Sequence, residues 1–187
     1  MRSSGFGVRA AFPAALVLAA LFSTAAHAVL KPGDAAPTFT TQAAVAGKPF
    51  AFNLQAALQK GPVVLYFFPK AFTQGCTLEA HAFAEATPRF KALGAQVVGM
   101  SHDDIDTLQR FSEEACRDQF AVASDPQART IQAYDAAAAA NPQRADRISY
   151  VIGQDGRIKF AHVGADPVEH VGKTMAAVEQ LQRGKKP

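Results

Sequence analysis

Residues 63–68, Val-Val-Leu-Tyr-Phe-Phe, form a continuous apolar run of β-branched and aromatic residues. Such a run is typical of a strand that is buried on both faces in the middle of a sheet. Pro69 ends the run, and a loop then leads into a helical pattern that begins near Thr73 to Cys76. The run therefore predicts an α/β protein in which this loop lies at the carboxyl end of a central strand.

The rest of the chain alternates between strand and helix patterns and closes with a hairpin and a final helix. Strands are expected at 38–46, 50–52, 96–100, 120–123, 148–152 and 157–163, and helices at 54–59, 73–94, 103–117, 127–134 and 168–181. Residues 135–146 are expected to form a loop, and Thr87-Pro88 to kink or restart the second helix. This order is the thioredoxin architecture with an N-terminal extension, in which a mixed central sheet is flanked by helices.

Residues 1–28 have the layout of a secretory signal peptide. Arg2 and Arg9 give a cationic start, an apolar stretch follows, and Ala-His-Ala ends the segment. We expect cleavage after Ala28, export to the periplasm or elsewhere outside the cytoplasm, and one mature domain over residues 29–187. The apolar stretch is shorter than the roughly 20 residues of a spanning helix, and retention as a membrane anchor is the alternative. No later segment is apolar for long enough to span.

The charge of the chain is close to balanced. Its net charge is +3, and loss of Arg2 and Arg9 would reduce it to +1. No run of Lys or Arg occurs before the C-terminal tail, and no aromatic residues are interleaved with that tail. A nucleic-acid partner is therefore not expected. No long exposed apolar face stands out, which favours a monomer.

The predicted mature chain keeps two cysteines, Cys76 and Cys116. In an exported protein such a pair suggests a disulfide. A purely structural bridge is one interpretation, although a domain of this size can hold its core without one. A redox-active pair is the other.

The position of Cys76 favours reactivity. It falls in the first turn of a helix at the carboxyl end of the predicted central strand, where α/β proteins place ligands. The unpaired N–H groups and positive dipole end of that helix favour a thiolate over a thiol. Thr73 can place a hydroxyl beside the sulfur, and Pro69 can wall a pocket without offering an N–H. A thiolate with nearby donors is what attack on a peroxide bond requires.

Pro69, Thr73 and Cys76 reproduce the peroxiredoxin signature P-x-x-x-T-x-x-C. The longer string from Val64 to Thr77 resembles the peroxiredoxin Q branch, also called bacterioferritin comigratory protein. The similarity covers most of the predicted mature chain and includes the segments 31–34, 99–101, 124–126 and 147–152.

The resemblance implies an antioxidant thiol peroxidase that reduces hydrogen peroxide and organic hydroperoxides. Cys76 would attack the peroxide and become a sulfenic acid, while Pro69 and Thr73 shape the pocket. Arg147 would stabilise the thiolate and donate to the peroxide, its alternative being a surface cation at a strand start. Glu79 would orient Arg147, unless it is an ordinary carboxylate on the helix surface. No cofactor is implied, and the histidines after the signal segment lack metal-ligand spacing.

The sequence departs from the family pattern at the resolving position. Many relatives carry a second cysteine five residues after the nucleophile, where this chain has His81. Ala71 and Gln74 also replace the acidic residue and proline usual in the loop. Cys116 is then the internal candidate, because charged neighbours suggest a partly solvated helix end. We expect Cys116 to resolve the sulfenic acid and a thioredoxin-like or other thiol reductant to recycle it, with a one-cysteine mechanism as the alternative.

Two other functions compete with the peroxidase. The first is a binding or chaperone module whose thioredoxin fold surrounds a structural Cys76–Cys116 disulfide. The second is a thiol–disulfide exchanger, which the absence of C-x-x-C disfavours. Consumption of peroxide by the reduced protein distinguishes them.

Overall fold

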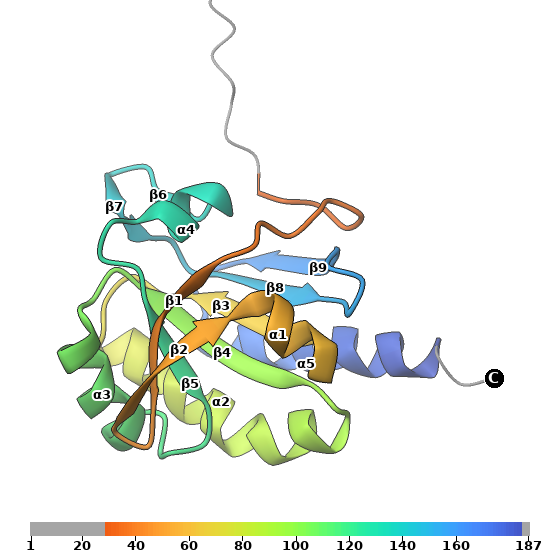
Figure 1. The fold of residues 1–187 in the computed structure, drawn as a ribbon, viewed down its shortest axis with the longest axis horizontal. Helices are drawn as coiled ribbons and strands as arrows, with labels where there is room; N and C mark the ends of the chain where they lie inside the picture. The colour runs from red at the N-terminus through yellow and green to blue at the C-terminus, as the bar shows by residue number, and fades with distance from the viewer. Residues whose placement is uncertain (1–28, 185–187) are drawn as a thin grey trace, which may run out of the picture.

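The computed structural model describes residues 29–184, so the predicted signal segment lies outside the described residues. Seven strands form one sheet in the order β2-β1-β5-β4-β3-β8-β9 (Figure 1). These strands are β1 Thr40–Val45, β2 Lys48–Asn53, β3 Val63–Phe67, β4 Gln96–Ser101, β5 Ala121–Ser124, β8 Ile148–Ile152 and β9 Ile158–Val163. The helices are α1 Leu54–Lys60, α2 Gln74–Ala92, α3 Ile105–Glu114, α4 Arg129–Ala133 and α5 Pro167–Arg183.

The apolar run at residues 63–67 is the central strand that the sequence predicts. β3 pairs in parallel with β4 and antiparallel with β8, and all five of its residues are buried. β4 also pairs in parallel with β5, so the sheet is mixed. The carboxyl ends of β3, β4 and β5 therefore lie at the same edge of the sheet, and the loop after β3 starts there.

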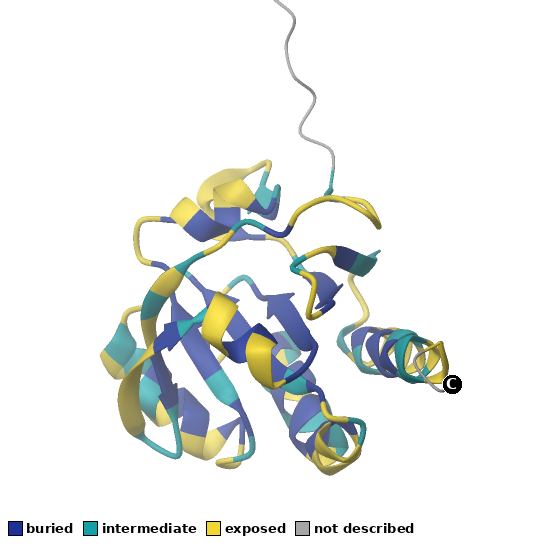
Figure 2. Ribbon diagram, turned by 45° about the vertical axis from the view of Figure 1, so that its right-hand side comes forward, coloured by how far each residue is buried: buried dark blue, intermediate teal, exposed yellow. Residues whose placement is uncertain are grey.

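Helices cover both faces of the sheet. Side chains of α1 and α4 join one apolar cluster with alternate residues of β3 such as Leu65 and Phe67. Side chains of α2, α3 and α5 join a second cluster with Val64 and Tyr66, on the opposite face. Figure 2 shows the central strands in dark blue, as buried, while yellow, exposed residues lie along the outer sides of the helices and on the edge strand β2. The thioredoxin-like fold predicted from the order of elements is confirmed.

The predicted restart of the second helix at Thr87-Pro88 is wrong. α2 runs without interruption from Gln74 to Ala92 and contains Pro88. The buried hydroxyl of Thr87 donates to the carbonyl of Phe83 at 2.7 Å, next to the Ala84 carbonyl that loses its N–H donor to proline. Packing of the buried helix face then outweighs the local preference of proline.

Residues 135–146 are not the plain loop that their Ala-rich and Asn-Pro composition predicts. They form a small two-stranded sheet of β6 Ala137–Ala138 and β7 Asn141–Ala145. Ala136 and Ala145 are buried at its base, and the N–H of Asp146 donates to the carbonyl of Ala136 at 2.7 Å. Anchoring of both ends in the core thus brings two weak strand segments together.

Within residues 29–184, no helix combines the length and the apolar character needed to cross a membrane.

Candidate active site

Cys76 lies where the sequence places it, in the first turn of α2 and just beyond the carboxyl end of β3. Thr73 is the N-cap of the helix, so Cys76 is its third residue. The side chain is almost enclosed, with 2% of the residue exposed. Unpaired N–H groups of the first turn and the positive end of the helix dipole favour negative charge at the sulfur.

Arg147 reaches the same point from the other side of β3. It directly precedes β8, whose first residue, Ile148, pairs with Phe67 at the end of β3. Its Nη2 lies 3.6 Å from the Sγ of Cys76, and 12% of its side chain is exposed. A guanidinium in this position stabilises a thiolate and keeps further N–H donors for an oxygen beside it.

Gly75 leaves the space that Arg147 occupies. A Cβ at this position would lie 3.2 Å from Nη2 of Arg147, the nitrogen that contacts the sulfur of Cys76. Any larger residue before the cysteine would therefore push against the guanidinium. Glycine here lets the guanidinium approach the sulfur without displacement.

Glu79 holds the other end of the guanidinium. It lies one turn after Cys76, is fully buried, and accepts a hydrogen bond from Nη1 of Arg147 through Oε2. Burial raises the pKa of Glu79 to about 8, against the opposing effect of Arg147. The surface-carboxylate interpretation of Glu79 is wrong.

The loop between β3 and α2 is fixed by Asp103, which the sequence predicts only as part of a helix start. Its Oδ2 accepts from the N–H of Ala71 at 2.7 Å and from the hydroxyl of Ser101 at 2.8 Å. Phe72 follows with φ 63°, a left-handed conformation that costs a bulky residue about 1–3 kcal/mol. Contacts from outside the loop therefore hold it in shape.

Thr73 and Pro69 bound this loop. The hydroxyl of Thr73 donates to the carbonyl of Lys70 at 3.0 Å, so its lone pairs remain free to accept a hydrogen bond from a ligand. Pro69 lies two residues beyond the end of β3, is partly buried and offers no N–H. The structure thus brings Cys76 and Arg147 into contact, with Thr73 and Pro69 at the ends of the loop beside them.

Comparison with known proteins agrees with this geometry. The AhpC/TSA family model matches residues 32–161, a range that includes every residue of the site described so far. The chain belongs to the AhpC/TSA family.

Its relatives within the family are peroxiredoxins of the Q branch. Peroxiredoxin Q of Populus jackii is 31% identical over 156 residues, which cover 82% of this chain and 70% of the relative. Peroxiredoxin Q of Oryza sativa subsp. japonica is 30% identical over 121 residues, 64% of this chain. The match spans 55% of the rice protein, little more than half its length. Both are chloroplastic proteins by name.

Solved structures of the family share the fold. Peroxidoxin BcpB of Mycobacterium tuberculosis has a TM-score of 0.73 and 25% identity, with 84% of this chain and 99% of that chain covered. AhpC of the same organism has a TM-score of 0.74 at 22% identity over 86% of this chain and 97% of the other. The predicted peroxiredoxin Q resemblance is therefore confirmed.

Cys116 differs from the expected partly solvated residue late in a helix. α3 ends at Glu114, and Cys116 lies in the turn that follows, with 0% exposed. Burial, with a smaller effect of Asp118, raises the pKa of its thiol well above the usual value. Both cysteines are free thiols and belong to the same apolar cluster under the sheet. The charged neighbours are exposed, but the sulfur is not.

Three site neighbours could not be found from sequence. Tyr66 of β3 is fully buried, and burial followed by the nearby Cys116, Glu79 and Cys76 raises its pKa well above the usual value. Ser149 and His170 are buried near Glu79, on β8 and α5. His170 is one of several histidines in the sequence, and its neighbours along the chain do not indicate this location.

The remaining histidines do not add a metal centre. His81, which occupies the usual resolving position, is only partly buried on α2. Over the part of the chain that the structure describes, no three His, Cys, Asp or Glu side chains are grouped to hold a metal ion.

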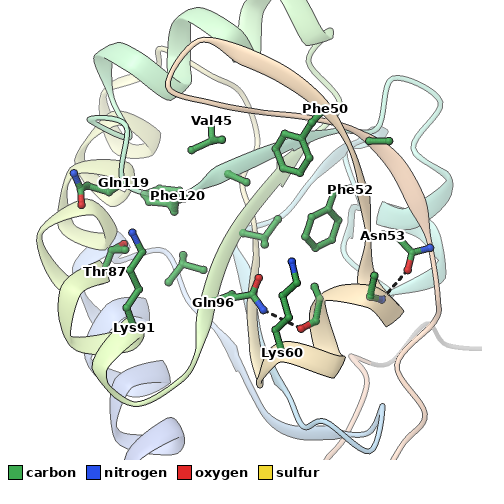
Figure 3. A pocket seen from close by; sticks show the side chains of 16 residues that line it. Val45, Phe50, Phe52, Asn53, Lys60, Thr87, Lys91, Gln96, Gln119 and Phe120 are labelled. Atoms are coloured by element: carbon green, nitrogen blue, oxygen red, sulfur yellow. Dashed lines mark hydrogen bonds between the residues drawn. The ribbon is translucent and has the colours of Figure 1, made fainter.

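A groove of about 410 Å³ lies apart from this site, between β2, α1 and the start of β4. Figure 3 shows the rings of Phe50, Phe52 and Phe120 within it, together with the side chains of Lys60 and Lys91. Neither Cys76 nor Arg147 contributes to its lining. The sulfur of Cys76 therefore lies at the loop after β3 and not in this groove.

Proposed function

We propose that this protein is a thiol-dependent peroxidase that reduces hydrogen peroxide and organic hydroperoxides at Cys76. The observation that carries the proposal is the 3.6 Å contact between the sulfur of Cys76 and the guanidinium of Arg147, at the N-terminus of α2. The helix dipole and the guanidinium of Arg147 thus both present positive charge to one enclosed sulfur. Family membership supports the same reaction.

The proposed first step oxidises Cys76 and reduces the peroxide. The thiolate attacks the terminal oxygen of R–O–O–H, an S–O bond forms, and the O–O bond breaks. The electron pair of that bond leaves on RO⁻, which takes up a proton and departs as the alcohol. Cys76 is left as a sulfenic acid, and Arg147 stabilises the negative charge as it moves from sulfur to the leaving oxygen.

Cys116 is proposed to complete the cycle. Its thiolate attacks the sulfur of the Cys76 sulfenic acid, an S–S bond forms, and the S–O bond breaks with release of hydroxide, which takes up a proton and becomes water. A thioredoxin-like reductant then opens the disulfide by thiol–disulfide exchange. Because both cysteines are buried, the turn around Cys116 or the first turn of α2 must open locally. Arg117 and Asp118 have φ of 49° and 60°, so the turn contains strained backbone that favours such opening.

Peroxide consumption by the reduced protein tests this proposal. Wild type supplied with excess dithiol should turn over repeatedly, and Cys76→Ser should consume nothing while retaining its circular dichroism spectrum. Cys116→Ser is the matched control, because it changes the other buried cysteine. Unchanged turnover of Cys76→Ser would refute the peroxidase proposal.

We further propose that the chain is exported, is cleaved after Ala28 and works as a monomer in the periplasm. The cationic, apolar and Ala-His-Ala parts of residues 1–28 support export. Cell fractionation and the mass of the mature N-terminus test this, and light scattering tests the monomer. A full-length cytoplasmic protein would contradict the first proposal.

A further inference from the structure

A buried polar group lies behind Arg147, on the side away from Cys76. It consists of Glu79 from α2, Ser149 from β8 and His170 from α5, each with 0% exposed. Nδ1 of His170 lies 2.8 Å from the hydroxyl of Ser149 and 4.0 Å from Oε1 of Glu79. Oε2 of Glu79 is already engaged by Arg147. Three elements therefore bring these side chains together under the peroxide site.

The tautomer of His170 follows from its hydrogen bonds. Nε2 lies 3.0 Å from the carbonyl oxygen of Gly164, which can only accept, so Nε2 carries the proton. In the neutral ring Nδ1 is then an acceptor, and Ser149 donates to it. The ring consequently offers no N–H to Glu79.

Oε1 of Glu79 is left facing this acceptor. It is buried and has no hydrogen-bond partner, and the nitrogen opposite it bears a lone pair. An ionised carboxylate is disfavoured in this position, because its outer oxygen is neither solvated nor donated to. A protonated carboxyl instead presents an O–H, and not a negative oxygen, toward Nδ1, whose lone pair already accepts from Ser149, while Oε2 still accepts from Arg147.

The titration of both groups agrees with this geometry. Burial raises the pKa of Glu79 to about 8, and burial lowers the pKa of His170 to about 4. Between these values Glu79 is protonated and His170 is neutral. One titratable proton is therefore retained on Glu79 across the neutral range, in addition to the proton that neutral His170 carries on Nε2.

The charged groups on the surrounding elements do not change these protonation states. His162 of β9 packs its ring against that of His170 with 4.5 Å between centroids, and Glu169 of α5 lies 3.8 Å from Nε2 of His162. Lys173 of α5 pairs with Glu169 at 3.3 Å, so that carboxylate is balanced. Arg147, directly before β8, is the cation in direct contact with Glu79.

We propose that His170 is a positioning residue of the peroxide site. Together with Glu79 it retains one titratable proton behind Arg147, so that the positive charge of Arg147 acts on the Cys76 thiolate alone. With that proton present, the guanidinium has one anionic neighbour, the thiolate. Without it, Glu79 competes as a second anion and repels the thiolate. The functional consequence rests on the proposed peroxidase activity, whereas the proton itself does not.

Carbon NMR of protein labelled at the glutamate side-chain carboxyl tests the proton directly. Glu79→Gln assigns the signal, and the expected titration has its midpoint near pH 8, well separated from surface glutamates near about 4.3. Titration of Glu79 together with the surface carboxylates would overturn the proposal. The measurement needs no peroxide, so it is independent of whether the protein is a peroxidase.

Two variants with opposite expected effects test the part of His170. Ser149→Ala frees Nδ1 to accept from Glu79 and should strengthen proton binding by about threefold. His170→Leu removes the acceptor and the opposing lone pair, and should weaken proton binding by about tenfold, with His170→Asn restoring part of it. His81→Leu, on the same helix as Glu79, is the control and should leave the titration unchanged.

The sign of these changes decides the proposal, because a merely structural role of His170 would not give opposite shifts. Shifts of the same sign, or none, in Ser149→Ala and His170→Leu would remove His170 from the proposal. If His170→Leu does not fold, the proposal is still tested by the wild-type titration of Glu79 and by the stronger proton binding expected in Ser149→Ala. Single-turnover oxidation of Cys76 at neutral pH should also fall several-fold in His170→Leu and recover in His170→Asn. An unchanged rate in His170→Leu would contradict the role in the site.

Discussion

The two cysteines are both buried under the same face of the sheet, yet their surroundings differ in the charge that they present. Cys76 sits at the start of a 19-residue helix with a guanidinium 3.6 Å away. Cys116 follows the end of α3, where the helix dipole is negative and Asp118 is the nearest charge to affect it. The contrast supports the proposal that a buried cysteine without a cation is inert toward peroxide, whereas positive charge beside the buried sulfur makes Cys76 reactive.

The largest expected difference is in alkylation. Under native conditions at neutral pH, we expect iodoacetamide to modify Cys76 at least about a hundredfold faster than Cys116, because thiolate character and access both favour Cys76. Peptide mapping at successive times measures both rates in one sample. Equal rates would mean that the contrast between the two surroundings has no chemical effect.

Removal of the cation should make Cys76 more like Cys116. Arg147→Met is expected to slow the first oxidation by more than about tenfold, since one decade corresponds to about 1.4 kcal/mol of lost stabilisation. Stopped-flow fluorescence and the ultraviolet absorbance of the thiolate measure the rate and the thiolate fraction. Arg129→Met, on an exposed residue of α4, is the control. An unaltered rate and thiolate fraction would place Arg147 outside the reaction.

Loosening the loop beside Cys76 should have a smaller effect. Asp103→Ala removes the acceptor of the Ala71 N–H and the Ser101 hydroxyl, and is expected to slow oxidation about threefold to tenfold. Asp103→Asn, which keeps an acceptor oxygen, should recover much of the rate. A rate equal to wild type in Asp103→Ala would show that the loop keeps its shape without this anchor.

The smallest effect is expected at Gly75. An added methyl group would lie 3.2 Å from Nη2 of Arg147, so Gly75→Ala should displace the guanidinium by a few tenths of an ångström. A loss of about twofold in oxidation rate is expected, because charge stabilisation falls gradually with distance. A faster reaction would indicate that the guanidinium is not optimally placed by glycine.

The sequence predicts much of this fold because its strongest patterns are local. The apolar run of β3 and the hairpin of β8 and β9 each follow from neighbouring residues, and each is confirmed. α2 passes through Pro88 because packing outweighs a local preference, which sequence patterns do not report.

The residues of the site also differ in whether local sequence patterns predict them. Cys76 and Thr73 belong to one turn and can be placed from their spacing, and Arg147 could be matched only through the family pattern. Asp103 and His170 form hydrogen bonds to residues distant in sequence, which only the arrangement of the elements determines. The prediction that Cys116 is partly solvated is wrong, because charged neighbours indicate an exposed turn but not the direction in which one of its side chains points.

The most direct test of the central claim is mass spectrometry of the reduced protein after one equivalent of hydrogen peroxide. Wild type should become about 2 Da lighter, with Cys76 and Cys116 linked in one peptide pair. Cys116→Ser should instead gain about 16 Da on Cys76, as the sulfenic acid. Stable sulfenic acid in wild type with a free Cys116 would contradict the two-cysteine cycle. A reduced Cys76 after the peroxide is added would contradict the account as a whole.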